Sequence, residues 1–480
     1  FAVLKAGGTV VNYNPLYAKR EMARQIEDSE TAIMVTLDLR QIYRKVAPML
    51  EETALEKIVV CPMGDILPML KSVLFTVFKR SKVAGIPSDS RHSTFAELTA
   101  CAGKAEPASI DPEKDIAVLQ YTGGTTGKPK GAMLTHANLA ANALQVRRWF
   151  HSAEAKGVKV GGMEAGGMEE GAERILGALP LFHVFAMTMV MNLGIAGGAL
   201  LILLPRFQIK QVLAAINDKR PTLFPGVPTI YTAVNTSPDL DKYDLSSIKY
   251  CISGGAPLPI EVKRTFEDLT GCVLVEGYGL SEASPVVACN PIDGPDKEGS
   301  IGLPMPGTII QIRDMEDPRK VLGAGEKGEV CVSGPQVMAG YWKRPGATAQ
   351  DTVDGYLRTG DVGYMDEDGY VFLIDRMKDL ILCGGYNVYP RAVEEAVHLH
   401  PAVEEVTVIG VADDYRGQAP KAFIKLRQGK SLTPEELLEF LKDKLSPIEM
   451  PDHIEFRKKL PKTMIGKLSK KELAAEEGGK

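Results

Sequence analysis

Cysteine is scarce in this chain of 480 residues, and the seven that occur are scattered at positions 61, 101, 251, 272, 289, 331 and 383. Their odd number and the absence of a CxxC pair argue against a disulfide framework or a zinc knuckle and favour a reducing compartment. Positive charge is not in excess either, because the chain has 56 basic and 61 acidic residues and a net charge of −5. We therefore expect a cytoplasmic protein with no nucleic acid partner.

A signal peptide is not evident, since the chain begins at Phe1 and no charged stretch precedes an apolar one. FAVLKAGGTVVNYNP is typical of the middle of a folded unit, so we expect an upstream part to be missing. The uncharged run Val184–Leu204 is a candidate membrane span. Its glycines and the closing Pro205 favour instead a helix to about Ile195, a Gly-Gly turn and a strand over Ala199–Leu204.

Short apolar runs alternate with amphipathic segments up to about residue 305, which predicts an α/β domain with largely parallel sheets. The predicted buried strands are 32–36, 57–61, 117–121, 199–204, 250–253 and 273–276. Frequent Gly and Asp turns after residue 305 indicate short antiparallel strands. We predict a large N-terminal α/β domain with stacked sheets over 1–375, truncated at its start, and a small mobile α+β domain over 376–480.

Two helices carry specific signals. The helix predicted at 434–445 begins with Thr433 as N-cap, Pro434 in the first turn and Glu436 three residues after the cap. Residues 66–82 (ILPMLKSVLFTVFKRSK) combine spaced apolar residues with a basic end. This segment is either an interfacial membrane helix or a helix packed on its own domain, and both interpretations stay open.

The strongest chemical signal is the string YTGGTTGKPKG, residues 121–131, between a predicted strand and a predicted helix. Its glycines allow backbone N–H groups to face phosphate oxygens, and its hydroxyl and ammonium groups add donors. It is not a Walker A loop, because Thr122 and Pro129 occupy places where that motif needs Gly and Ser or Thr. The candidate phosphate-binding residues are Thr122, Gly123, Gly124, Thr125, Thr126, Gly127, Lys128 and Lys130.

A second string, EGYGLSE at 276–282, follows a predicted strand. Gly277 and Gly279 allow a planar ligand to approach beside Tyr278, and Ser281 and Glu282 place oxygen atoms at the end of the string. A carboxylate there suits Mg²⁺, which prefers oxygen ligands and keeps phosphate as a co-ligand.

Four further residues are candidates for a chemical role. Asp361 and Arg376 come from consecutive strand-like strings, and across a hairpin they could hold ribose hydroxyls; a surface salt bridge is the alternative. Lys467, in PKTMIGK, could neutralise charge that develops in a transition state. His183, in LPLFHVF, is either a core histidine or part of a carboxylate pocket. No GxSxG elbow or HExxH motif occurs.

These strings, in this order from Phe1 to about Leu473, resemble the adenylate-forming (AMP-binding) superfamily. The phrases EGYGLSEASPVVACNP, GGYNVYPRAVEE and HPAVEEVTVIGVADDYRGQ resemble bacterial long-chain fatty acid–CoA ligases. The resemblance implies ATP, Mg²⁺ and coenzyme A as co-substrates and cofactor, a fatty acid as substrate, and two steps through an acyl-adenylate. Ligases for short-chain or aryl acids, and a non-catalytic acyl- or nucleotide-binding relative, are the alternatives. Peripheral contact with the inner face of a membrane and a homodimer are left open.

The resemblance also implies a role for each motif. Residues 122–131, with Thr126 among the catalytic groups, would hold the β- and γ-phosphates, and Glu282 would bind Mg²⁺. Lys467 would assist adenylation, Asp361 and Arg376 would hold ribose, and Lys378 occupies the hinge position. Adenine would lie between Gly255, Ala256 and Pro257 and the segment Glu276, Gly277 and Tyr278. Gly384, Gly385 and Tyr386 would meet coenzyme A, and His183 would line the substrate pocket.

Overall fold

The computed structural model describes residues 1–100, 103, 106–122, 129–151, 159–160, 163–164, 168, 170–384, 386–413, 415–462 and 468–478. The chain separates into two compact units. The first comprises residues 1–124, 128–136 and 339–343, and the second comprises 125–127, 137–338 and 344–480. The predicted boundary between residues 375 and 376 lies within the second unit and stays a prediction.

The first unit contains two sheets. Strands β2 (Ile33–Leu37), β3 (Lys57–Cys61) and β4 (His92–Thr94) are parallel, and β2 and β3 lie at the predicted runs 32–36 and 57–61. Strand β3 is buried as predicted, whereas β2 is not fully buried, because Ile33 and Val35 are exposed. Apolar side chains of these strands pack with helices into a core that includes Ile26, Met49 and Ile58. The helices of this unit are α1 (Ala2–Lys5), α2 (Lys19–Ser29), α3 (Arg40–Val46), α4 (Met49–Glu52), α5 (Met63–Ile66), α6 (Met69–Phe78), η1 (Arg80–Lys82) and α7 (Phe95–Thr99).

The second sheet of this unit has the order β1 (Val10–Val11), β5 (Ile116–Thr122) and β6 (Lys130–Thr135). Strand β5 is parallel to β1 and antiparallel to β6. The predicted strand at 117–121 is confirmed. Its partner β6 brings Lys130 opposite Thr122, so the two ends of the predicted phosphate loop meet at one edge of this sheet.

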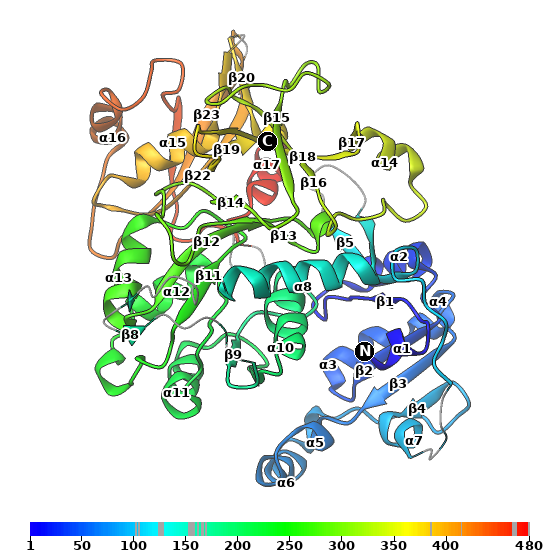
Figure 1. Cartoon of the computed structure of the whole chain (residues 1–480). Coiled ribbons are helices and arrows are strands. Elements are labelled where there is room, and N and C mark those ends of the chain that lie inside the picture. The colour runs from blue at the N-terminus through cyan, green and yellow to red at the C-terminus, as the bar shows by residue number, and fades with distance from the viewer. Residues whose placement is uncertain are drawn as a thin grey trace. The chain divides into compact units, whose positions relative to one another are not determined.

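The parallel part of the second unit is built from β9 (Arg174–Gly177), β10 (Leu200–Leu203), β11 (Tyr250–Ser253) and β12 (Val273–Gly279). Leu223 bridges β9 to β11 in parallel register. Helices α11 (Ile209–Lys219), α12 (Pro228–Asn235) and α13 (Ile260–Thr270) accompany these strands (Figure 1). Phe224, Tyr231 and Phe266 are fully buried and contact one another, so their large apolar area stabilises this core. Strands β7 (Lys159–Val160) and β8 (Met163–Glu164) form a separate hairpin.

The run Val184–Leu204 forms two elements, as predicted, but its strand is not buried as predicted, because Leu200 and Leu203 are 55% and 52% exposed. Helix α9 (Val184–Ala186) continues through a π-helical turn, η3 (Met187–Asn192), into α10 (Leu193–Ala196). Gly197 and Gly198 then turn the chain into β10. No helix in the described part of the chain is long and apolar enough to span a bilayer.

Antiparallel strands follow, as the turn-rich sequence after residue 305 indicates. Strands β13 (Val286–Cys289) and β14 (Leu303–Pro304) extend the sheet from β12. A separate sheet has the order β15 (Ile309–Arg313), β16 (Gly328–Ser333), β18 (Tyr356–Met365), β17 (Thr352–Val353), and β19 (Val371–Arg376) also pairs with β18. Further short elements of the second unit are η4 (Leu240–Lys242), η5 (Ser281–Ala283) and α14 (Pro345–Gln350).

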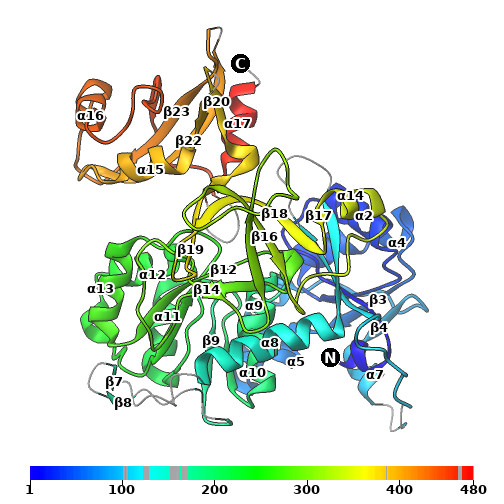
Figure 2. The same ribbon diagram turned by 45° about the horizontal axis from the view of Figure 1, so that its top comes forward.

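The C-terminal part of this unit is an α+β arrangement. Its sheet has the order β21 (Tyr386–Val388), β20 (Ile381–Cys383), β23 (Gly417–Leu426), β22 (Val403–Asp413), and β24 (His453–Phe456) also pairs with β23. Helices α15 (Pro390–His398) and α17 (Lys470–Gly478) lie beside this sheet (Figure 2). Helix α16 (Pro434–Leu441) has the predicted capping box, with Thr433 Oγ1 accepting from the Glu436 N–H. It ends four residues earlier than predicted.

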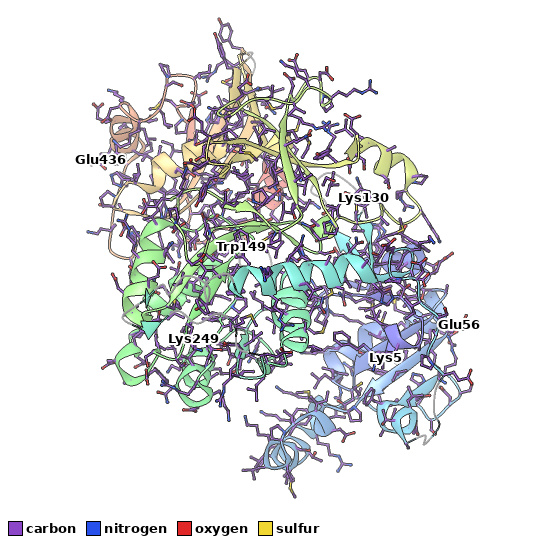
Figure 3. The ribbon with its side chains drawn as sticks, viewed as in Figure 1. Lys5, Glu56, Lys130, Trp149, Lys249 and Glu436 are labelled. Atoms are coloured by element: carbon purple, nitrogen blue, oxygen red, sulfur yellow. The ribbon has the colours of Figure 1, made fainter. Side chains whose placement is uncertain are left out.

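A buried network of amides joins α8 (His136–His151) to neighbouring segments. Asn142 accepts from the Val286 N–H and donates to the Val286 carbonyl, at 3.0 and 2.8 Å. The Gln145 side chain donates to Gln336 Oε1 at 3.2 Å, and Gln336 Nε2 donates to Thr308 Oγ1 at 2.6 Å. Trp149, labelled on this helix in Figure 3, donates to the Asn290 carbonyl at 3.1 Å. Neutral groups with satisfied hydrogen bonds therefore fix the helix.

Candidate functional site

The hairpin of β18 and β19 places an acidic residue opposite a basic residue. Asp361 and Arg376 are directly opposed in its antiparallel register. Asp361 Oδ1 lies 3.0 Å from Arg376 Nε, and the backbone N–H of Asp361 donates to Thr359 Oγ1 at 3.0 Å. Asp361 is buried, while the Arg376 side chain is 44% exposed. This is the predicted hairpin pair, although the acid is buried rather than at the surface.

Strand β12 supplies a third member of this site. The Tyr278 hydroxyl donates to Asp361 Oδ2 at 2.5 Å. Burial and the Asp361 charge raise the pKa of Tyr278 well above its usual value, so the hydroxyl keeps its proton and acts as a donor. The next residue must be glycine, because a Cβ on Gly279 would lie 2.3 Å from the Pro285 carbonyl oxygen. The glycines of the EGYG string therefore allow close backbone packing beside Tyr278.

Glu282 and Lys378 add charge to this site. Glu282 lies in η5, where Ser281 begins the turn, and its backbone carbonyl accepts from the Met338 N–H at 2.8 Å. Lys378 lies in η6 (Met377–Asp379), which follows β19 directly. Burial and the Arg376 charge lower the pKa of Lys378, whereas Asp379, Asp361 and Glu282 act to raise it. The site thus combines two carboxylates with two cations.

Glu276 lies at the start of the same string. Its Oε2 accepts from the Leu258 N–H at 3.2 Å, directly after Gly255, Ala256 and Pro257. Burial raises the pKa of Glu276 to about 7, although Arg391 and Lys263 act to lower it. The two segments predicted to enclose adenine are therefore brought together by a hydrogen bond.

His183 is the N-cap of α9, and its Nδ1 accepts from the Phe185 N–H at 3.3 Å. Burial lowers the pKa of His183, so the ring is neutral at pH 7. Phe185 reaches the adenine segment, because a Cβ on Gly254 would lie 3.2 Å from Phe185 Cζ. The segment that carries His183 therefore lies next to the residues predicted to bind the nucleotide.

The predicted phosphate loop is described at its two ends. Tyr121, at the end of β5, donates to Asp28 Oδ2 at 2.7 Å, and Lys130 begins β6, where Figure 3 labels it. Lys130 Nζ lies 4.4 Å from the centre of the Tyr341 ring. Gly123, Gly124, Thr125, Thr126, Gly127 and Lys128 lie outside the described residues.

The predicted coenzyme A segment is the turn between β20 and β21. Cys383 pairs with Tyr386 across this hairpin, and the Gly384 N–H donates to the Arg416 carbonyl at 2.8 Å. The side chain of Tyr386 is 66% exposed, which leaves it available for a ligand. Gly385 and Lys467 lie outside the described residues.

Comparison with known proteins shows which protein family has this arrangement of residues. Residues 1–342 match the AMP-binding enzyme family, and residues 392–467 match the AMP-binding enzyme C-terminal domain. The chain belongs to the AMP-binding enzyme family. The resemblance stated from its motifs is confirmed.

Relatives in this family cover almost the whole chain. The chain is 46% identical to the long-chain-fatty-acid–CoA ligase of Bacillus subtilis, over 99% of this chain and 82% of that protein. It is 37% identical to the ligase of the same name from Salmonella typhimurium, over 100% of this chain and 83% of that protein. Its fold matches the crystal structure of ATP-bound MatB from Rhodopseudomonas palustris with a TM-score of 0.83. That match has 29% identity and covers 99% of this chain and 85% of MatB.

As an AMP-binding enzyme, the chain requires a place for Mg²⁺. Among the described residues, no three His, Cys, Asp or Glu side chains gather as a metal site. Mg²⁺ is usually held by one or two carboxylates, substrate phosphates and water rather than by an all-protein cage. A single carboxylate at Glu282 fits that mode of binding.

Sequence reasoning missed Asp375, whose hydrogen bonds support this site. Asp375 Oδ1 accepts from the Arg376 N–H at 2.8 Å, and Asp375 Oδ2 accepts from the Arg391 N–H at 2.7 Å. It therefore ties the end of β19 to the first turn of α15. The string DRMKD contains Asp375, but nothing in that string indicates that a residue 16 positions later is its partner.

Proposed function

We propose that this protein is an ATP- and Mg²⁺-dependent ligase that joins long-chain fatty acids to coenzyme A. In the first step, a carboxylate oxygen of the fatty acid attacks the α-phosphorus of ATP. An oxygen–phosphorus bond forms, and the bond to the pyrophosphate leaving group breaks. In the second step, the deprotonated thiol of coenzyme A attacks the acyl carbon and AMP leaves.

The observation that carries this proposal is the end-to-end similarity to ligases for long-chain fatty acids, within a family that forms adenylates. The site agrees with it chemically. Asp361 accepts and Arg376 donates, so together they offer complementary partners for two neighbouring hydroxyls such as those of ribose. Glu276 and Tyr278, on the same strand, supply an acceptor and an aromatic ring for adenine.

The remaining roles are proposals that rest on the motifs. Glu282 would hold Mg²⁺, which when bound neutralises phosphate charge. Lys467 and Thr126 would act at the α-phosphate during adenylation, and His183 would line the acyl pocket. The loop from Thr122 to Lys130 would bind the phosphates, and Gly384 to Tyr386 would meet coenzyme A. The domain boundary at 375/376 would allow the C-terminal domain to rotate about Lys378 between the two steps.

We also propose a cytoplasmic location with peripheral contact at the inner face of a membrane. Six free cysteines among the described residues support a reducing compartment. The apolar and basic segment 66–82 supports the membrane contact. A homodimer, which the sequence analysis left open, is tested by light scattering on the same preparation.

The experiment that tests this function is AMP release from ATP, with and without coenzyme A. The acids would range from acetate to oleate, with benzoate and coumarate as aryl probes. We expect a signal that depends on coenzyme A and is largest for long chains. A maximum at acetate or at the aryl acids would reject the long-chain assignment. Silence with every acid, from this chain and also from the full-length protein while both still bind ATP, would reject the ligase.

A further inference from the structure

Helix α6 turns its apolar side chains to solvent. Six large apolar residues of this ten-residue helix are exposed, with exposed fractions between 47% for Leu74 and 87% for Met69. At 100° per residue they fall within one half of the helix circumference. They are Met69, Leu70, Val73, Leu74, Val77 and Phe78.

The opposite side of the helix carries Ser72, Phe75 and Thr76, of which Ser72 and Phe75 are half-buried, and it faces α5. A Cβ on Gly64, in α5, would lie 3.5 Å from Ser72 Oγ and 3.8 Å from Thr76 Oγ1. These two hydroxyls share a face, because they are four residues apart. No residue of α6 is buried. The broad apolar face of α6 therefore meets solvent, whereas the apolar face of an ordinary surface helix packs on the core and its polar face meets water.

Basic residues flank this apolar face. Lys71, Lys79, Arg80 and Lys82 are all exposed, and the segment from Ile66 to Lys82 contains no Asp or Glu. Within the described part of the chain, none of these four side chains forms an ion pair. The local charge is therefore +4 in a protein whose net charge is −5.

We propose that α6 and η1 form the surface by which this protein docks onto an anionic lipid bilayer. This inference deepens the peripheral membrane contact proposed above by naming the surface and the lipid charge that it requires. The six apolar side chains would enter the boundary between headgroups and acyl chains, with the helix lying in the plane of the membrane. The four cations would meet anionic headgroups, each contributing a favourable interaction at low salt.

Charge complementarity favours a bilayer over another protein as the occupant. A protein partner for this face would need both an apolar groove and a ring of acids that match four cations. A bilayer supplies both as a continuous surface, since its apolar interior lies directly beneath its anionic headgroups. A fatty acid substrate also partitions into the same bilayer, so docking there would bring the enzyme to its substrate.

Flotation of the whole chain with vesicles tests the inference. One set of vesicles is phosphatidylcholine alone, and the other is equal parts of phosphatidylcholine and phosphatidylglycerol. We expect flotation with the anionic vesicles, weakening as salt rises because the headgroup interaction is screened. Absence of flotation with both sets, from protein with normal ligase activity on detergent-dispersed oleate, would overturn the inference and leave the proposed function standing.

Two triple variants locate the surface. Leu70→Gln/Leu74→Gln/Phe78→Gln removes apolar area while keeping residues compatible with a helix, and Lys79→Gln/Arg80→Gln/Lys82→Gln removes charge. We expect the charge variant to bind anionic vesicles about a hundredfold more weakly at low salt, and the apolar variant at least about tenfold more weakly. Both should retain activity on detergent-dispersed oleate, because the residues changed are exposed and lie outside the candidate site.

Matched controls make the same changes elsewhere. Leu98→Gln/Leu269→Gln/Leu399→Gln alters three exposed leucines, and Lys19→Gln/Arg20→Gln/Arg24→Gln alters three exposed cations. We expect both controls to float like the wild type. If the α6 variants also float like the wild type, a different surface binds lipid and the inference fails. It fails equally if the α6 variants only convert a lipid-free dimer to a monomer, since the face would then pair with a second copy.

Discussion

The two carboxylate oxygens of Asp361 have different partners, with Oδ1 facing Arg376 Nε at 3.0 Å and Oδ2 accepting from the Tyr278 hydroxyl at 2.5 Å. Each oxygen has two lone pairs, so each retains a position for one more donor. The carboxylate is thereby oriented before any ligand arrives. A pair of ribose hydroxyls can use the two remaining positions without moving the side chain.

The Asp361→Asn variant tests this arrangement. The amide would keep the shape of the side chain but lose the charge and one acceptor. Because hydrogen bonds to charged groups contribute about 1.5–3 kcal/mol, we expect the KM for ATP to rise about tenfold to a hundredfold. Initial rates of pyrophosphate release at varied ATP measure this. The exposed Asp241→Asn variant is the control, and an unchanged KM for ATP in Asp361→Asn would remove the proposed ribose role.

The Glu282→Gln variant tests the magnesium site. The amide keeps an oxygen ligand but removes the charge, so the half-saturating Mg²⁺ concentration should rise at least about tenfold. Adenylation rates at saturating ATP across a Mg²⁺ titration measure the shift. The exposed Glu435→Gln variant should titrate like the wild type. A loss of rate with no change in the Mg²⁺ midpoint would assign Glu282 to a different task.

Glu276 should make the stability of the protein depend on pH. The pKa of Glu276 in the folded state is about 7, above the ordinary value of 4.5. Its contribution to the free energy of unfolding is therefore fully present below pH 4.5. The contribution is lost as pH rises through 7, by about 3 kcal/mol in total. The Glu276→Gln variant has no titratable group at this position, so it lacks this loss of stability as pH rises. We expect the variant to gain stability relative to the wild type between pH 4.5 and 7, measured by thermal unfolding, with Glu261→Gln as control.

Lys467 should matter in one half-reaction. Because the proposed role is to neutralise charge during adenylation, Lys467→Ala should slow acyl-adenylate formation by at least about a hundredfold. It should leave thioester formation from a supplied acyl-adenylate near the wild-type rate. Separate assays of the two steps measure the effect, with Lys462→Ala as a nearby control. Equal losses in both steps would contradict the assignment.

Local sequence signals predicted much of the fold. Branched apolar runs marked the parallel strands, and the capping pattern at Thr433 located the start of α16. The glycines at 197 and 198 separated α10 from β10 in a run long enough to suggest a membrane span. In each case the determining residues lie within a few positions of the structure that they specify.

Contacts between distant residues were not predictable in the same way. Tyr278 and Asp361 are 83 positions apart, and neither motif alone indicates the other as its partner. The orientation of α6 is a similar case. Its periodicity shows that one face is apolar, but which face meets solvent depends on how Ser72 and Thr76 pack against α5.

The amide network around Asn142 has a consequence for how the molecule responds to its surroundings. Its members, Asn142, Gln145, Gln336 and Thr308, are neutral at every pH at which the protein is folded. The hydrogen bonds that hold α8 therefore contain no titratable group, whereas Glu276, on strand β12, gains and loses its charge. Acidification through pH 7 adds a proton to Glu276, while none of the groups that hold α8 changes its charge.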